Sequence, residues 1–475
     1  MKKIFTILLS LATVTTAMAG GPMTNTNQSA AFLRSIARGT TLDTDAVYNN
    51  PAGTAFMEDG WHLGINDQMA KQTRTINSTF APFAMGAANN GQASKEFKGE
   101  VFSPLIPSVH LTWKKNRWAV MLGMGVNGGG GSLEFEDGLG SFERQFSVLP
   151  MGVSNLGQAF GLSANQYNMD MYLKGSSQTL AFNAGVAFRI TDWLSAAAMV
   201  RYSTTSNAYE GYMKNIQINP TCAALGLNGA MMSAPQFFQA VGAKLGAMNP
   251  QLAAAATQYA ALTSDHILDV EQTGNSISPV LALYFQKGKW AASAKYEFKM
   301  GTELEIKSAE VSAKDPVING IFADGSKVKA ETPALLALAA SRQCGPVKIT
   351  AEYHLYFDKD AENSFSSCIE GNTMEYLVGA EWQISKKWLV SCGVQRTQYD
   401  LDENAYSDMN FSTPSWSTGI GAAYQVCDML RINLGVMPTF YEDVTSTGVD
   451  SNGLNFTDVY SRTSLSWGLG LDFKF

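Results

Sequence analysis

The last eleven residues of the chain alternate strictly between apolar and polar side chains. The apolar face carries Leu465, Trp467, Leu469, Leu471, Phe473 and Phe475. The polar face carries Ser466, Gly468, Gly470, Asp472 and Lys474. A period of two residues predicts a β-strand. A strand that is apolar on one side and ends the chain on Phe is typical of a membrane-spanning barrel, whose outside faces lipid and whose lumen is wet. An edge strand of a soluble sandwich is the alternative.

The N-terminus has the pattern of an export signal. Lys2 and Lys3 precede the apolar run 4–14, and Ala17-Met18-Ala19 supplies the small residues of a cleavage site. The apolar run is shorter than the ~20 residues that a membrane-spanning helix needs. We therefore expect residues 1–19 to be a signal peptide and the mature chain to lie in the outer membrane of a Gram-negative bacterium.

The composition also favours a barrel. Charged residues make up only 16% of the chain, against the ~25% of typical soluble domains, and aromatic residues make up 11%. The net charge of −7 offers no basic surface for nucleic acid, so no nucleic-acid partner is expected.

Short and long connections between strand-like stretches alternate along the chain. The short ones are 114–117, 191–192, 287–289, 344–346, 385–387 and 427–428, four of which precede a Trp. The long ones are about 80–106, 128–177, 209–275, 303–332, 358–373, 400–414 and 442–462. Periplasmic turns and extracellular loops segregate in this way. The pattern predicts an all-β fold, a 14-stranded antiparallel transmembrane β-barrel over residues 58–475, which crosses the membrane many times.

Charged residues determine the register of several predicted strands. In 290–300, a slip of one residue would turn Lys295, Glu297 and Lys299 toward lipid, at a cost of ~2–4 kcal/mol for each Lys near the midplane. The stretches 277–286 and 332–342 are apolar on both faces and cannot be oriented. Their inward faces would contact either a plug or an apolar ligand.

The segment 28–60 resembles a known family. It contains Arg34, then an acidic, Ala-rich stretch, and then Asn50-Pro51-Ala52. This order is similar to the N-terminal segment of the OmpP1/FadL/TodX family of outer-membrane transporters for long-chain fatty acids and hydrocarbons. The resemblance continues through the stretches 103–108 and 118–135 and the Trp-marked turns.

The resemblance implies a barrel closed by an N-terminal hatch, here residues 20–57, in which Arg34, Asn50, Pro51 and Ala52 are the matching positions. It also implies that a hydrophobic molecule enters from outside and leaves sideways at a kinked third strand. That strand would be 118–127, and its glycines and those that follow are Gly123, Gly125, Gly128 and Gly129. Glycine weakens a strand and often marks a bend. A flexible start to a long loop is the alternative interpretation.

Two of the long connections carry many apolar side chains and are predicted to be partly helical. The candidate ligand-binding residues among them are Phe146, Leu149, Met151, Leu156, Phe160, Phe237, Phe238, Val241 and Leu245. Such patches mark ligand sites, or the two loops simply pack on each other, or both. In the family a basic residue on the fifth strand meets a fatty-acid carboxylate, but Glu210 occupies that position here, which leaves Arg201 and Lys214 as candidates.

These features together predict a passive, ligand-selective channel that takes up hydrophobic molecules, either fatty acids or hydrocarbons, through an apolar pocket and a lateral opening. A general diffusion porin for small polar solutes is the alternative. The four histidines are scattered and no catalytic or metal-binding motif occurs, so we expect no enzyme, cofactor or metal. The expected partners are the cargo, outer-membrane lipids and the barrel-insertion machinery, and the protein is expected to be a monomer.

Overall fold

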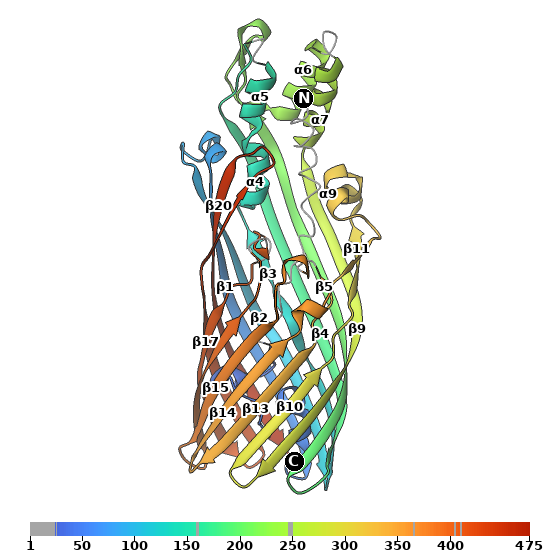
Figure 1. The fold of residues 1–475 in the computed structure, drawn as a ribbon, viewed down its shortest axis with the longest axis vertical. Helices are drawn as coiled ribbons and strands as arrows, with labels where there is room; N and C mark the ends of the chain where they lie inside the picture. The colour runs from blue at the N-terminus through green and yellow to red at the C-terminus, as the bar shows by residue number, and fades with distance from the viewer. Residues whose placement is uncertain are drawn as a thin grey trace.

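The chain forms a closed antiparallel barrel of fourteen strands, as the alternating connections predict (Figure 1). The computed structural model describes residue 24 and residues 26–157, 161–245, 250–363, 366–402, 405–408 and 411–475. The barrel strands are β1 (Gly60–Phe80), β2 (Ser94–Lys115), β3 (Trp118–Phe135), β4 (Tyr167–Arg189), β5 (Leu194–Ile218), β9 (His266–Lys287), β10 (Trp290–Glu297), β13 (Leu335–Cys344), β14 (Val347–Tyr356), β15 (Thr373–Gln383), β16 (Trp388–Gln398), β17 (Ser415–Cys427), β18 (Leu430–Tyr441) and β20 (Asn455–Lys474). Pairing of β1 with β20, from His62–Lys474 to Phe80–Phe456, closes the cylinder.

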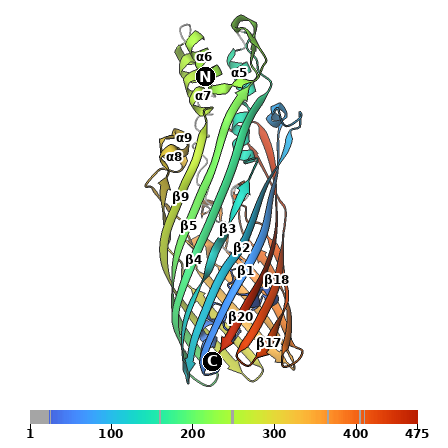
Figure 2. The same ribbon diagram turned by 180° about the vertical axis from the view of Figure 1, so that it is seen from behind.

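Several strands extend farther above the membrane than the sequence pattern predicts. β4 begins at Tyr167 and β5 ends at Ile218, well inside stretches that were predicted to be loops. The error arises because the upper parts of these strands lack an apolar lipid-facing side and yet remain paired with their neighbours. Figure 2 shows β4, β5 and β9 rising together above the rest of the wall.

The outside of the barrel has the apolar belt of a membrane-spanning protein. Lys295 and Glu297 are buried in the lumen while Trp290 faces outward, so the predicted register is confirmed over β10. The prediction is wrong beyond Glu297, where β10 ends: Lys299, predicted to face inward, is exposed and pairs with Glu331, and Met300 is buried. Exposed tryptophans follow the end of the barrel at which both termini of the sheet and the short turns lie: Trp61, Trp118, Trp193, Trp290, Trp382 and Trp388. Tryptophan prefers the interface between lipid and water, so this end marks one membrane boundary and places the chain among outer-membrane barrels.

The other end of the barrel carries helices and short strands. The helices are α4 (Gly140–Ser147), α5 (Leu149–Gly157), α6 (Ala234–Leu245), α7 (Pro250–Leu262), α8 (Glu310–Lys314) and α9 (Pro316–Ile321). Pro235 lies at the start of α6. Backbone N–H groups in the first turn of a helix have no partner within the helix, so the missing N–H of proline does not weaken it there. Short strands extend the wall or the loops: β6 (Thr221–Cys222), β7 (Leu227–Asn228), β8 (Met232–Ser233), β11 (Glu303–Ser308), β12 (Lys327–Lys329) and β19 (Val444–Val449).

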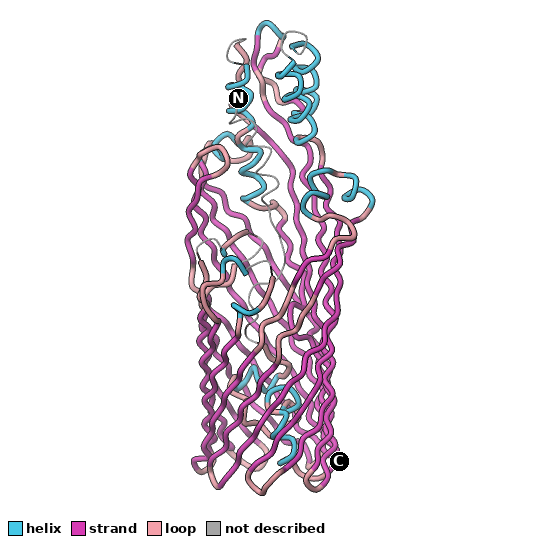
Figure 3. The backbone as a smooth tube through the Cα atoms, turned by 45° about the vertical axis from the view of Figure 1, so that its right-hand side comes forward, coloured by secondary structure: helices cyan, strands magenta, loops and turns pink. Residues whose placement is uncertain are grey.

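Residues 26–57 lie inside the barrel. They contain helix α2 (Ala30–Ser35), helix α3 (Ala46–Asn49) and a 3-10 helix, η2 (Pro51–Phe56). Figure 3 shows these helices in the bore near the end where the short turns lie. We call residues 26–57 the hatch. The predicted signal peptide, 1–19, lies outside the described residues, and no helix in the described part of the chain is long and apolar enough to cross a membrane.

Helix α2 approaches the wall closely where the wall presents glycine. A Cβ added to Gly435 would lie 2.5 Å from the carbonyl oxygen of Ala30, and one added to Gly419 would lie 2.6 Å from that of Leu33. Ser29 caps the helix, because its side chain accepts a hydrogen bond from the Phe32 N–H. The helix backbone therefore rests directly on the inner surface of the sheet.

We expect Gly435→Ala to displace the hatch and to destabilise the protein by ~1–3 kcal/mol, the usual cost of overpacking a filled interior. Thermal unfolding in detergent measures this change. Gly152→Ala is the matched control, because an added Cβ there meets no atom within 4 Å. Equal stability of the two variants would contradict the close contact.

Candidate functional site

A network of buried charges holds the hatch in the bore, and Arg38 is at its centre. Its guanidinium contacts Asp45 at 2.9 Å, Asp43 at 2.7 Å and Glu381 of β15 at 2.9 Å. The side chain also donates to the Thr41 hydroxyl at 2.6 Å. A buried charge is stable only when it is paired and hydrogen-bonded, and Arg38 meets both conditions.

Two further arginines extend this network to the barrel wall. Arg34 of α2 bonds to Glu381 at 2.7 Å and to the Ser391 hydroxyl at 2.9 Å. Arg431 of β18 lies 2.7 Å from Asp43 and 3.0 Å from Asp472 of the last strand. Each cation thus has a carboxylate partner, and the contacts join the hatch to three separate strands.

The Asn50-Pro51-Ala52 segment has a structural role in the hatch. The Asn50 side chain donates to the Thr41 carbonyl at 2.9 Å and accepts from the Gly53 N–H at 3.2 Å, so it caps η2 and joins it to the preceding loop. The Ala52 carbonyl accepts from Ser195 of β5 at 2.6 Å. The side chains of this stretch pack on inward apolar residues of the wall.

Those inward residues explain 277–286, one of the two stretches that the sequence pattern cannot orient. Val280, Ala282 and Tyr284 of β9 are buried inside the barrel against Val47 and Ala55 of the hatch. Of the two alternatives for this strand, contact with a plug is therefore the correct one.

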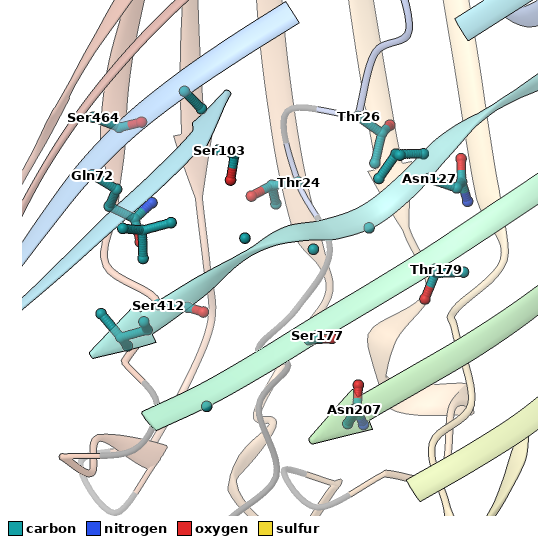
Figure 4. Close-up of a pocket in the computed structure, with 18 of the residues that line it drawn as sticks. Thr24, Thr26, Gln72, Ser103, Asn127, Ser177, Thr179, Asn207, Ser412 and Ser464 are labelled. Carbon is teal, nitrogen blue, oxygen red and sulfur yellow. The ribbon is translucent and has the colours of Figure 1, made fainter. Parts of the chain in front are cut away.

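A cavity of about 510 Å³ lies above the hatch. Thr24, Thr26 and Asn27 of the N-terminal segment contribute to its lining. Much of the remaining lining consists of hydroxyl and amide side chains, which Figure 4 shows pointing into it: Gln72, Ser103, Asn127, Ser177, Thr179, Asn207, Ser412 and Ser464. Apolar side chains line the part nearest β2, β3 and β4: Val101, Ile106, Val126, Leu133, Phe135 and Leu173. The lining is thus mixed, whereas the sequence predicts an apolar pocket.

A cluster of buried apolar side chains, many of them aromatic, borders the cavity on the side of the loops. Phe135 and Leu173 belong both to the lining and to this cluster, whose other buried members are Ile76, Phe80, Phe83, Phe97, Leu139, Val148, Met171, Phe411 and Tyr460. Arg144 of α4 holds the helix over the cluster through contacts of 2.8 and 2.9 Å with Asp458. We call this group the aromatic cluster.

Strands β2 and β3 are paired at both ends but not between them. The ladder places Ser108 opposite Gly125 and, higher up, Val101 opposite Leu133. The residues between these two pairs, all of them described, form no rungs with each other. We call this part of the wall the unpaired stretch. It adjoins the cavity, because residues of both strands within it belong to the lining.

Backbone chemistry accounts for the position of the unpaired stretch. β3 bulges twice against β4 here, and Gly129 and Gly130 have φ angles of +70° and +106°, which other residues rarely adopt. On the other strand, Pro104 and Pro107 lack an N–H to donate.

The four glycines predicted at this strand fall into two groups. Gly128 and Gly129 lie in the bulged region and line the cavity. Gly123 and Gly125 lie in the regularly paired part below it, where a Cβ would meet Val47 and Gln28 of the hatch.

The predicted ligand-binding residues of the loops are largely packed on each other. Phe146, Leu149, Phe237, Phe238 and Val241 are buried in one shared core, whereas Met151 is 39% exposed. Leu156 and Leu245 lie in α5 and α6, but their side chains are outside the described part of the structure, as is all of Phe160. The mutual packing that the sequence left as an alternative is therefore present.

Neither predicted carboxylate partner is positioned as a free cation in the cavity. Arg201 is buried against Glu297, to which it is hydrogen-bonded, and it donates to Asn183 at 2.8 Å. Lys214 lies higher on β5, over the Tyr212 ring and opposite Asp170 in the ladder. No group of three or more potential metal ligands occurs among the described residues.

The structure thus defines a transmembrane barrel that is closed by its own N-terminal segment and has a cavity beside an interrupted wall. Solved structures with this fold include a FadL homologue of Pseudomonas aeruginosa, 14% identical with a TM-score of 0.61 over 96% of this chain and 100% of the other. They also include the toluene transporter TodX of Pseudomonas putida, 12% identical with a TM-score of 0.52 over 92% of this chain and 95% of the other. A third is the toluene transporter TbuX of Ralstonia pickettii, 13% identical with a TM-score of 0.51 over 97% of each chain.

No protein-family model and no curated protein matches the sequence. The predicted resemblance to FadL and TodX is confirmed in the fold, which this chain shares along nearly its whole length.

We expect Arg38→Met to release the hatch, because it leaves three carboxylates without their shared cation, at a cost of ~3–5 kcal/mol for a broken buried pair. Single-channel conductance should rise, and chymotrypsin should cut the hatch faster, because its sites at Phe32 and Tyr48 are unchanged by the substitution. Arg117→Met is the control, because Arg117 contacts Asp192 at 3.6 Å on an exposed turn. Unchanged conductance and unchanged cleavage in Arg38→Met would show that the network does not hold the hatch.

Proposed function

We propose that the protein is a passive, ligand-selective channel that takes up hydrophobic molecules across the outer membrane. The observation that carries this proposal is the unpaired stretch between β2 and β3 beside a cavity whose floor is the hatch. A molecule in that cavity meets a filled bore below it and a weakened wall beside it. Two of the solved structures with this fold are toluene transporters, which supports a cargo of this class.

In this proposal the cargo binds first at the loops, near Met151, which stands exposed beside the packed core. It then passes the aromatic cluster, whose rings offer apolar contact without directional hydrogen bonds. The cavity receives it next, and it leaves through the unpaired stretch into the membrane. Phe102 and Leu105 are exposed on the lipid side of β2 at that point and present an apolar surface.

A general diffusion porin is the second candidate. Its support is the hydroxyl and amide lining of the cavity. A porin needs a continuous aqueous path, however, and residues 26–57 fill the bore with buried side chains and ion pairs. A hydrophobic molecule that leaves through the wall of the barrel does not have to pass the hatch.

A disulfide across the unpaired stretch tests lateral release. An added Cβ at Gly131 lies 3.7 Å from the Cβ of Ser103, a separation that suits a disulfide. We expect oxidised Ser103→Cys/Gly131→Cys to lose most uptake of a radiolabelled fatty acid or of toluene, and a reductant to restore it. Each single cysteine variant is a control, in a background where the exposed Cys344, Cys392 and Cys427 are replaced by serine. Full uptake by the oxidised double variant would exclude release at this position.

Removal of residues 20–45 tests the hatch as a barrier. The variant should keep the heat-dependent gel mobility of a folded barrel but admit small polar solutes, measured as conductance in planar bilayers. Unchanged permeability would contradict a closing role for the hatch. A large stable conductance in the intact protein would instead favour the porin.

A further inference from the structure

Two arginines lie side by side on the cavity wall. Arg74 of β1 is directly opposite Arg462 of β20 in the ladder, and both side chains line the cavity. The Arg74 guanidinium lies 5.5 Å from the centre of the Phe411 ring, and Arg462 lies 4.4 Å from that of Tyr441. Like charges directly opposite each other on neighbouring strands destabilise a sheet. This pair therefore adds a local cost to the strand pairing that closes the barrel.

No carboxylate offsets that cost among the described residues. Neither arginine takes part in an ion pair there; Arg74 donates to the Gln72 side chain at 3.1 Å, and the buried Nε of Arg462 has no hydrogen-bond partner. The hatch arginines Arg34 and Arg38, in contrast, each contact at least one carboxylate.

The other charged side chains of the cavity lining are already compensated. Lys329 is hydrogen-bonded to Glu362, and Glu331 lies 2.7 Å from Lys299. Burial opposes ionisation of Glu331, but hydrogen bonds from Lys299 and from the Glu362 N–H outweigh it and lower the pKa of this carboxyl group. Glu331 is thus ionised and is neutralised by Lys299. The arginine pair gives the cavity an excess of positive charge.

Neutral hydrogen-bonding groups surround the pair. Gln72 and Ser464 lie one step below it on the same two strands, and Thr439 and Ser466 continue this polar wall. Figure 4 shows Gln72 and Ser464 together at one side of the cavity. The apolar part of the lining belongs to β2, β3 and β4, next to the unpaired stretch. The cavity thus has a cationic side and an apolar side, within a volume suited to one small ligand.

We propose that Arg74 and Arg462 together bind the carboxylate of an amphipathic ligand whose apolar part lies against the β2–β4 side of the cavity. The guanidinium group matches the geometry of a carboxylate and forms strong charge-assisted hydrogen bonds with it. The bound anion supplies the missing counter-charge for both arginines. This inference rests on the proposed function and narrows its cargo to single-chain or aromatic carboxylic acids.

Binding to the purified full-length barrel in detergent tests the assignment with matched probes, oleate with oleyl alcohol and benzoate with benzyl alcohol. The intact protein should bind at least one acid more tightly than its alcohol. Arg74→Gln and Arg462→Gln should each weaken binding of that acid about tenfold or more, the strength of a charge-assisted hydrogen bond, and leave the alcohol unaffected. Arg74→Lys and Arg462→Lys should retain part of the affinity. Lys327→Gln is the control and should change nothing, because Lys327 lies outside the cavity lining and is already paired with Glu303 at 3.3 Å.

The outcomes distinguish a failure of the carboxylate site from a failure of the proposed uptake function. Equal binding of acid and alcohol, or loss of both probes together in the glutamine variants, would overturn the carboxylate assignment and leave hydrophobic uptake intact. Binding of none of the four probes to the intact protein would overturn the uptake function itself. Heat-dependent gel mobility confirms in each case that the variant barrel is folded.

Discussion

The pairing of β1 with β20 is the interaction on which the rest of the structure depends. In a bilayer an unpaired backbone N–H or C=O has no water to bind, so a sheet can cross only if its first and last strands meet. Here they pair along their whole lengths, from His62–Lys474 to Phe80–Phe456. Closure then fixes the lumen, and the lumen determines where a hatch and a cavity can lie.

The same requirement explains how a closed wall can contain a weak point. Every rung removed from a barrel exposes polar backbone, so an interruption costs least where few donors exist. Pro104 and Pro107 remove two N–H groups from β2, and the glycines of β3 let the backbone turn its remaining groups toward β4. The unpaired stretch is therefore a consequence of sequence composition at one place in the wall. A shorter gap in the ladder of β17 and β18, between Ser417–Thr439 and Ile420–Val436, also contains a proline, Pro438.

The sequence was sufficient for the features that depend on local periodicity. The alternation in 290–300 predicted the inward positions of Lys295 and Glu297, and the short turns predicted the strand number. Features that depend on distant partners were not predictable. The inward apolar face of β9 is covered by the hatch, which is distant in the sequence, and no pattern within β9 contains that information.

The candidate site shows the same division. The glycines after 127 and the hatch segment were visible as motifs, but the cationic pair was not. The inward position of Arg74 follows from strand parity, yet its significance depends on the absence of a carboxylate nearby among the described residues, which only the folded barrel reveals. Arg201, the candidate that the sequence suggested, is not available to a ligand carboxylate because Glu297 already neutralises it. The loops were predicted to be apolar, but how far they bury each other depends on their packing.

A mixed cavity lining suits passive transport better than a wholly apolar one would. A channel must bind its cargo well enough to admit it and weakly enough to release it. Buried hydroxyl and amide groups favour water, so they reduce the gain from placing an apolar chain against them. A ligand held at one side by charge and only loosely elsewhere can exchange its apolar contacts in the cavity for lipid without a large barrier. In the proposed pathway the polar lining thus contributes to release, and the hatch that fills the bore below the cavity leaves the wall as the route into the membrane.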